Sequence, residues 1–484
     1  MTTTRGQVCP VLTFLVFSAG AMFGQVATPD AGISYQGLIP VPPWTTTGAT
    51  AESVDLSSFN PVTQILYYAD HVNHAVVAID TRTNSIWGWV PVPNCTGSCP
   101  SGVLVVPDLQ ILVVTDRATH VYIYDLTLAG SPPAAVTGPT AVDELDYDPI
   151  HHRVYVGNTT APYFLTGIDL LGRTANTVVA SIPLPGAPEQ ARFNPVDGLD
   201  YLTIPSVGIV VVDPDAGSAG TGAIVTTYTL TGCSGNGNWI DPVTNTMLVG
   251  CNNGAATQSK LGEFLVSLVD GTVLAQFPGV NTDDVMGFNP GNRRWYTASG
   301  SNTNNGGKCP STNTGTVYPA VGVFAAGTAS APMGTFVGAA CSGRGGSTLA
   351  VDPIHNNVFV PVAQYPPDPA SNATGAAGIL VFHDPSPTET TPAHSTAPLG
   401  TYGTADFLLQ GRAMAATAVL KGVPDQGTEL VVTTTVGNEV VPCFEFSGQA
   451  YCIGSLIGDP LMGGMALVGS GTKVLTKGKI ALAK

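Results

Sequence analysis

The chain has 484 residues, of which 44% are hydrophobic and only 10% are charged. This length suits one large domain or two ordinary ones, and the apolar content is enough for a sizeable core. The net charge of −16 argues against nucleic acid or an anionic membrane as a partner, because both are themselves negative. Glycine and proline, 57 and 39 residues, favour many tight turns over long helices.

The first 21 residues have the features of an export signal. Arg5 supplies a positive charge, an apolar run follows it, and Ala19-Gly20-Ala21 is a small-residue cleavage site. No later stretch approaches the length of apolar sequence that a membrane span requires. We therefore expect residues 1–21 to be a signal peptide and the mature protein to be secreted, whether extracellular, periplasmic or at the cell surface.

A short phrase recurs along the chain, as in "DPIHHRVYV" at 148–156 and "DPIHNNVFV" at 352–360. It consists of an Asn/Asp-Pro dipeptide, a few loose residues and a run rich in β-branched and aromatic residues. The seven copies are anchored by Pro61, Pro107, Pro149, Pro195, Pro242, Pro290 and Pro353, and the second copy is abbreviated, with Val106 before its proline. Successive anchors are 46, 42, 46, 47, 48 and 63 residues apart, so the phrase marks a structural repeat.

Each repeat contains the phrase within a set of four short apolar runs separated by turn-forming residues. The third repeat, for example, reads "ELDYDP", "RVYVGN", "FLTGIDLL" and "TVVASIPLP" between residues 144 and 185. Four strands every forty-odd residues are typical of a β-propeller. The sequence therefore predicts an all-β fold, with seven four-stranded antiparallel blades over residues 50–405. The Asn/Asp-Pro dipeptide is predicted to form the turn after the innermost strand, with the side chain capping the turn.

The repeat resembles the YVTN-type, surface-layer-protein-like β-propeller repeat of exported microbial proteins. The residues that carry the resemblance are Tyr155-Val156-Gly157-Asn158 and "VVAIDTRTNSI" at 76–86. The resemblance covers about residues 50–405 and implies a propeller scaffold. It names no ligand and no activity.

The segments on either side of the repeats lack the phrase. Residues 22–49 include "ISYQGLIPVPPW" (33–44), which could supply a strand that closes the ring. Residues 406–484 form a β-rich C-terminal extension for which three alternatives stay open. They are an eighth blade, a small separate β domain, and a contribution to ring closure.

Loss of the signal removes Cys9 and leaves eight cysteines, an even number, for an oxidising compartment. They fall into neighbouring pairs along the chain, and pairing between neighbours is the simplest arrangement. The predicted disulfides are Cys95–Cys99, Cys233–Cys251, Cys309–Cys341 and Cys443–Cys452. A metal site is disfavoured, because the closest pair lacks both C-x₂-C spacing and a nearby histidine.

Equivalent positions around the predicted ring are found by counting six residues back from each anchoring proline. They are Asp55, Ser101, Asp143, Glu189, Asn236, Asp284 and Ser347. All are polar and four are acidic, and they belong to strands that line the channel. We predict a ligand site formed by Asp55, Asp143, Glu144, Glu189, Asn236, Asp283 and Asp284. Within it, Asp55, Asp143, Glu189 and Asp284 are the candidate metal ligands, and Ca²⁺ is the candidate cofactor. The alternative is that strand starts are polar because they meet water.

No catalytic residue is predicted, since the sequence contains no G-x-S-x-G, H-E-x-x-H or Walker phosphate motif. The histidines are scattered, and we expect those in the turns to be solvated. The favoured function is a binding or scaffold module for an extracellular protein, a glycan or a small ligand. The alternative is a metal-dependent propeller enzyme, a lactonase, lyase or hydrolase, that uses the acidic ring.

Overall fold

The computed structural model describes residues 31–41 and 54–385, and the backbone of six strands between residues 398 and 469. Within the longer range it leaves out 129, 172–174, 218–220, 252–261, 278–279, 281–283, 303–317, 329, 344 and 366–375. The predicted signal peptide, Asp283 and Cys309 therefore lie outside the described residues. Among those that are described, no helix is long and apolar enough to cross a membrane.

Seven four-stranded antiparallel sheets form the blades of a closed ring, which confirms the predicted β-propeller. Blade 1 contains β2 (Val54–Asn60), β3 (Ile65–Asp70), β4 (Ala75–Asp80) and β5 (Ser85–Pro91). Blade 2 contains β6 (Val103–Val106), β7 (Ile111–Thr115), β8 (His120–Asp125) and β9 (Ala134–Thr137). Blade 3 contains β10 (Val142–Asp148), β11 (Arg153–Asn158), β12 (Phe164–Asp169) and β13 (Thr177–Pro183). Blade 4 contains β14 (Ala191–Asn194), β15 (Leu199–Ile204), β16 (Gly208–Asp213) and β17 (Ala223–Tyr228).

The remaining blades follow the same order, except that the last one borrows a strand. Blade 5 contains β18 (Gly235–Asp241), β19 (Thr246–Cys251), β20 (Glu263–Ser267) and β21 (Val273–Phe277). Blade 6 contains β22 (Met286–Asn289), β23 (Arg294–Asn302), β24 (Tyr318–Ala325) and β25 (Thr335–Cys341). Blade 7 contains β26 (Ala350–Asp352), β27 (Asn357–Tyr365), β28 (Ala376–His383) and β1 (Ser34–Pro40). The first strands of neighbouring blades contact one another around the whole ring.

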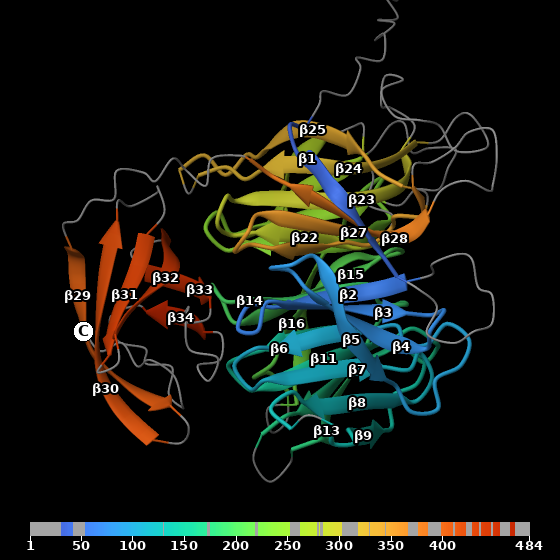
Figure 1. The fold of residues 1–484 in the computed structure, drawn as a ribbon, viewed down its shortest axis with the longest axis horizontal. Coiled ribbons are helices and arrows are strands. Elements are labelled where there is room, and N and C mark those ends of the chain that lie inside the picture. Colours follow the sequence, from blue (N-terminus) through green and yellow to red (C-terminus); the bar gives the residue numbers. More distant parts are fainter. Residues whose placement is uncertain are drawn as a thin grey trace, which may run out of the picture.

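The N-terminal strand β1 completes blade 7 from outside. It pairs antiparallel with β28, with Ser34 opposite His383 and Pro40 opposite Gly378 (Figure 1). Apolar side chains then seal blade 7 against blade 1, where Leu66 and Tyr68 pack with Phe359. The Tyr68 hydroxyl donates a 2.8 Å hydrogen bond to the carbonyl of Phe359. Strands from both ends of the propeller sequence therefore close the ring.

The repeated phrase forms the turn between the first and second strands of every blade, as predicted. In blade 1, Asn60 Oδ1 accepts hydrogen bonds from the backbone N–H groups of Val62 and Thr63, at 2.9 and 3.3 Å. Equivalent caps are made by Asp148, Asn194, Asp241, Asn289 and Asp352. The fifth residue of each turn is left-handed, with φ between 51° and 78°, namely Gln64, Gln110, His152, Gly198, Asn245, Arg293 and Asn356. The turn chemistry alone is thus enough to explain why the phrase recurs.

Disulfides join two of the predicted neighbouring pairs, Cys95–Cys99 and Cys233–Cys251. Cys341 is disulfide-bonded as well. Disulfides of this kind indicate an oxidising compartment, outside the reducing cytosol.

The C-terminal extension contains a six-stranded antiparallel sheet in sequence order, separate from the blades. Its strands are β29 (Pro398–Leu409), β30 (Arg412–Gly422), β31 (Thr428–Thr434), β32 (Gly437–Phe446), β33 (Gln449–Gly454) and β34 (Met465–Gly469). The last strand of the blades ends at His383, so the boundary predicted at residue 405 falls within β29. The register sets Cys443 directly opposite Cys452, while their side chains lie outside the described part.

Candidate ligand-binding site at the channel mouth

The two ends of the propeller channel are formed by different connections between strands. The turns of the repeated phrase lie at one end, which we call the turn face. The first strand of each blade begins at the other end, which we call the channel mouth. Because neighbouring strands are antiparallel, the connections between second and third strands also lie at the mouth. Asp55 in β2, Asp143 and Glu144 in β10, and the residues just before β14 and β22 therefore belong to this end.

Arg117 links two of the predicted site residues. Its guanidinium lies 3.1 Å from Asp55 Oδ2 through Nη1 and 3.7 Å from Asp143 Oδ2 through Nη2. His71 lies near the same oxygen, with Nε2 3.4 Å from Asp55 Oδ2. The Arg117 side chain is 47% exposed, whereas that of Asp55 is 10% exposed. This part of the mouth therefore presents a partly exposed guanidinium that the largely buried carboxylates of Asp55 and Asp143 hold in place.

Three acids of the mouth converge on one another near this pair. Glu144, Glu189 and Asp284 come from blades 3, 4 and 6, and one carboxylate oxygen of each lies within 4.8 Å of the other two. Glu144 is buried, with 4% of its surface exposed. Neither Glu144 Oε2 nor Asp143 Oδ1 has a hydrogen-bond partner among the described residues.

Burial and mutual repulsion raise the pKa values of these acids. The pKa of Glu189 is raised to about 7, first by burial and then by the charges of Asp143 and Asp55. The pKa of Asp143 is raised to about 6 by burial and by Asp55, while Arg117 opposes the shift. Burial also raises the pKa of Glu144 well above its ordinary value, and Asp284 adds to the effect. Near neutral pH the mouth therefore holds carboxyl groups that are poised to exchange protons or to accept a cation.

The predicted site residues are divided between these two groups. Asp55 and Asp143 lie beside Arg117, and Glu144 joins Glu189 and Asp284. Asn236 is buried, and its backbone carbonyl accepts a 2.7 Å hydrogen bond from Thr203. Ser101 is fully buried and donates its hydroxyl to the carbonyl of Val142. Blade 2 therefore has Ser101 where some other blades have an acid. Its charged residue at the mouth is Arg117, which lies in the connection between β7 and β8.

Arg117 and His71 were missed by counting along the first strands only. Both directly follow an aspartate that ends or follows the second strand, in "ADHVNH" and "TDRATH". These connections lie at the same end of the ring as the strand starts. A search for charged residues in them would therefore have found both side chains.

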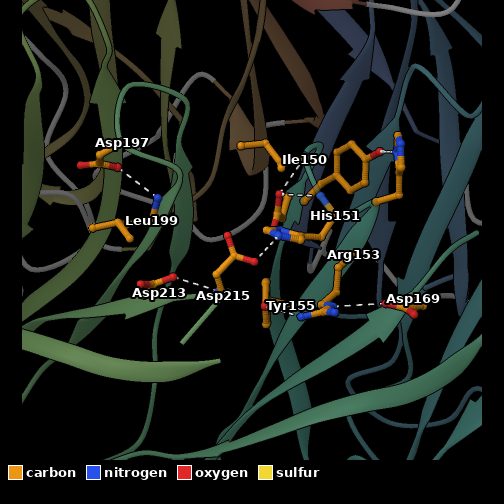
Figure 2. Close-up of polar contacts among 12 residues, drawn as sticks. Ile150, His151, Arg153, Tyr155, Asp169, Asp197, Leu199, Asp213 and Asp215 are labelled. Carbon is orange, nitrogen blue, oxygen red and sulfur yellow. Dashed lines mark hydrogen bonds and ion pairs between the residues drawn. The ribbon is translucent and has the colours of Figure 1, made fainter. Parts of the chain in front are cut away.

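Figure 2 shows a second set of polar contacts, at the turn face between blades 3 and 4. His151 Nδ1 contacts Asp148 of its own turn, and His151 Nε2 lies 3.0 Å from Asp215 Oδ1 of blade 4. Arg153 Nε lies 3.2 Å from Asp169 Oδ1 in the same view. The hydrogen bond to Asp148 raises the pKa of His151. This histidine was expected to be merely solvated, but it joins two blades.

Asp200 is buried behind these contacts in the seam between blades 3 and 4. It is 0% exposed, and neither of its carboxylate oxygens has a hydrogen-bond partner among the described residues. Burial raises its pKa well above the ordinary value, the charges of Asp148 and Asp146 add to this, and Arg153 opposes it. The equivalent second-strand positions are all apolar and fully buried, namely Leu66, Leu112, Val154, Met247, Trp295 and Val358. Asp200 is therefore an acid in the place of a core residue.

Comparison with known proteins supports the fold and goes no further. No family model matches the sequence, and no curated protein matches it. A chain of hydrazine synthase from Kuenenia stuttgartiensis is structurally similar, with a TM-score of 0.51 and 16% sequence identity. The match covers 67% of this chain and 96% of that chain. Likeness at such low identity concerns the fold alone, so the YVTN-type family stays a prediction. The chain is a seven-bladed β-propeller.

Proposed function

We propose that the protein is a binding module whose channel mouth takes a hydroxyl-rich ligand such as a glycan. Carboxylates accept hydrogen bonds from hydroxyl groups and a guanidinium donates them, so the mouth offers both kinds of partner. Ligand sites in rigid folds combine a concave surface with a few convergent polar groups of this kind. The disulfides support a place of action outside the cytosol, in keeping with a signal peptide at residues 1–21.

The observation that carries this proposal is the position of Arg117. Asp55 and Asp143 hold its guanidinium, yet 47% of the side chain is exposed to solvent at the mouth. An arginine whose rotamer is already restricted loses little conformational entropy when a ligand arrives. It therefore has the properties of a preorganised donor.

Glycan-array binding of the labelled full chain tests the proposal, followed by calorimetry on the strongest glycan. We expect Arg117→Ala to weaken binding about tenfold or more, because a hydrogen bond from a charged group is lost. Arg82→Ala is the matched control, since Arg82 pairs with Asp80 in a turn away from the mouth and is similarly exposed. Binding to no glycan, or equal affinity of wild type and Arg117→Ala, would overturn the proposal.

A second candidate function is metal-dependent hydrolysis at the same mouth. The observation in its favour is that the pKa values of Glu189 and Asp143, about 7 and about 6, suit proton transfer near neutral pH. Hydrolysis of a chromogenic lactone in the presence of Ca²⁺ tests it. A rate no greater than that in buffer, or an undiminished rate in Glu189→Gln, would reject this candidate.

A further inference from the structure

Glu144, Glu189 and Asp284 have a spacing that matches one large divalent ion. Ca²⁺ binds oxygen ligands at about 2.3–2.6 Å, so two ligands on opposite sides of one ion lie about 5 Å apart. The three carboxylate oxygens lie within 4.8 Å of one another. A single ion can therefore contact all three. Ca²⁺ also tolerates irregular geometry better than Mg²⁺, which suits ligands contributed by three separate blades.

The state of Glu144 points independently to a missing partner. Its side chain is 4% exposed, and its Oε2 atom has no hydrogen-bond partner among the described residues. A buried carboxylate oxygen without a partner is costly, and such groups in native proteins usually bind a proton, water or an ion. Because this atom belongs to a side chain of the three-acid group, a cation there would remove the cost.

Glu144 and Glu189 differ from Asp55 and Asp143 in the charged side chains that contact them. Arg117 pairs with Asp55 and Asp143. In the described part of the chain, no lysine or arginine nitrogen lies within 4 Å of a carboxylate oxygen of Glu144 or Glu189. Arg117 offsets part of the negative charge around Glu189 without contacting it, and protonation or a bound cation would offset more of the repulsion between the acids. A divalent ion offsets the charges of two carboxylates at once.

We propose that Glu144, Glu189 and Asp284 bind one Ca²⁺ ion at the channel mouth. This inference deepens the proposed function, on which its role in ligand binding rests. Ca²⁺ takes six to eight ligands, so three carboxylates leave positions for water or for the hydroxyl groups of a ligand. The ion and Arg117 would then contact neighbouring parts of one ligand.

The test uses CaCl₂ alone, so it does not depend on any glycan. The full chain is stripped with EDTA, dialysed and titrated with CaCl₂ by calorimetry at pH 7.5. We expect one site per chain, and a loss of affinity of about tenfold or more in Glu189→Gln, since one charged ligand is removed. Glu144→Gln is expected to behave likewise. Glu189→Gln alone decides the outcome if the more deeply buried Glu144 variant fails to fold.

Asp215→Asn is the control for the change in net charge. Asp215 lies at the turn face and its side chain is 82% exposed. The Asp215→Asn variant should bind Ca²⁺ with wild-type affinity. Absence of any Ca²⁺ binding by the wild type would overturn the site, and so would equal affinity of wild type and Glu189→Gln. If Ca²⁺ binds and no glycan does, the metal site stands and the proposed function fails.

Discussion

Arg293 of blade 6 donates a 2.6 Å hydrogen bond to Asp241 of blade 5, fifty-two residues earlier in the chain. Asp241 caps the turn of its own blade, and Arg293 is the left-handed fifth residue of the next turn. The same relationship joins Asn194 to Asn245 at 2.9 Å, and Asn289 to Asn356 at 2.8 Å. In blades 4 to 7 the repeated phrase therefore shapes each blade and also links it to its neighbour.

This relationship predicts the effect of Arg293→Ala on stability. The Asp241 side chain is 0% exposed, so removal of Arg293 leaves a buried carboxylate without its charged partner. We expect the free energy of unfolding to fall by about 2 kcal/mol. Thermal and urea unfolding will measure it.

Arg82→Ala is the matched control, because Arg82 pairs with Asp80 inside one blade and its side chain is 53% exposed. Exposed pairs contribute little, so its effect should be much smaller. Equal losses in the two variants would mean that the link between blades adds nothing to stability.

The acids of the mouth predict how stability depends on pH. The pKa values of Glu189 and Asp143 are raised in the folded protein, to about 7 and about 6, above their values in the unfolded chain. Folding therefore favours the protonated form of each acid. The resulting contribution to the free energy of unfolding is complete at low pH and is lost as the pH rises through about 6 and 7. In EDTA, we expect the melting temperature to fall between pH 5 and pH 8.

Glu189→Gln should reduce this dependence, because glutamine does not titrate. Added Ca²⁺ should raise the melting temperature of the wild type more at pH 8 than at pH 5, where protons compete for the carboxylates. A melting temperature that increases with pH in EDTA would contradict the raised pKa values.

The seam between blades 3 and 4 predicts a stabilising substitution. Asp200 is fully buried where blades 1 and 2 have Leu66 and Leu112. A buried polar group without hydrogen-bond partners is costly, and replacing even a buried ion pair by apolar residues of similar volume is often neutral or stabilising by about 1–4 kcal/mol. We expect Asp200→Leu to increase the free energy of unfolding at pH 8, and less so at pH 5, where the acid is more readily protonated. Leu66→Asp should destabilise. A loss of stability in Asp200→Leu at both pH values would show that the acid is needed in the seam.

The C-terminal sheet predicts a disulfide that peptide mapping can detect. Cys443 and Cys452 are directly opposite in the pairing of β32 with β33, and such backbone proximity permits a bridge. Non-reducing digestion should yield the two cysteines in one linked peptide. Free thiols at both positions, or a link from either to Cys309, would refute the pairing.

Much of the fold could be predicted because its signals are local. The Asn/Asp-Pro turns and the short strands depend on residues a few positions apart, and both features recur in successive repeats. Neighbouring cysteines such as Cys233 and Cys251 were predictable for the same reason. Equal offsets from the repeated proline also identified residues at the start of the first strand of each blade.

Contacts between blades were decided only by the tertiary structure. Sequence spacing did not show that Arg117 would pair with Asp55 and Asp143. It also did not show that Glu144 would lie near Glu189 and Asp284. The contact of His151 with Asp215 was equally hidden. Nor did sequence spacing choose β1 over the C-terminal extension as the strand that completes blade 7. These partners are tens to hundreds of residues apart. Their meeting depends on the closure and curvature of the whole ring, which no local pattern encodes.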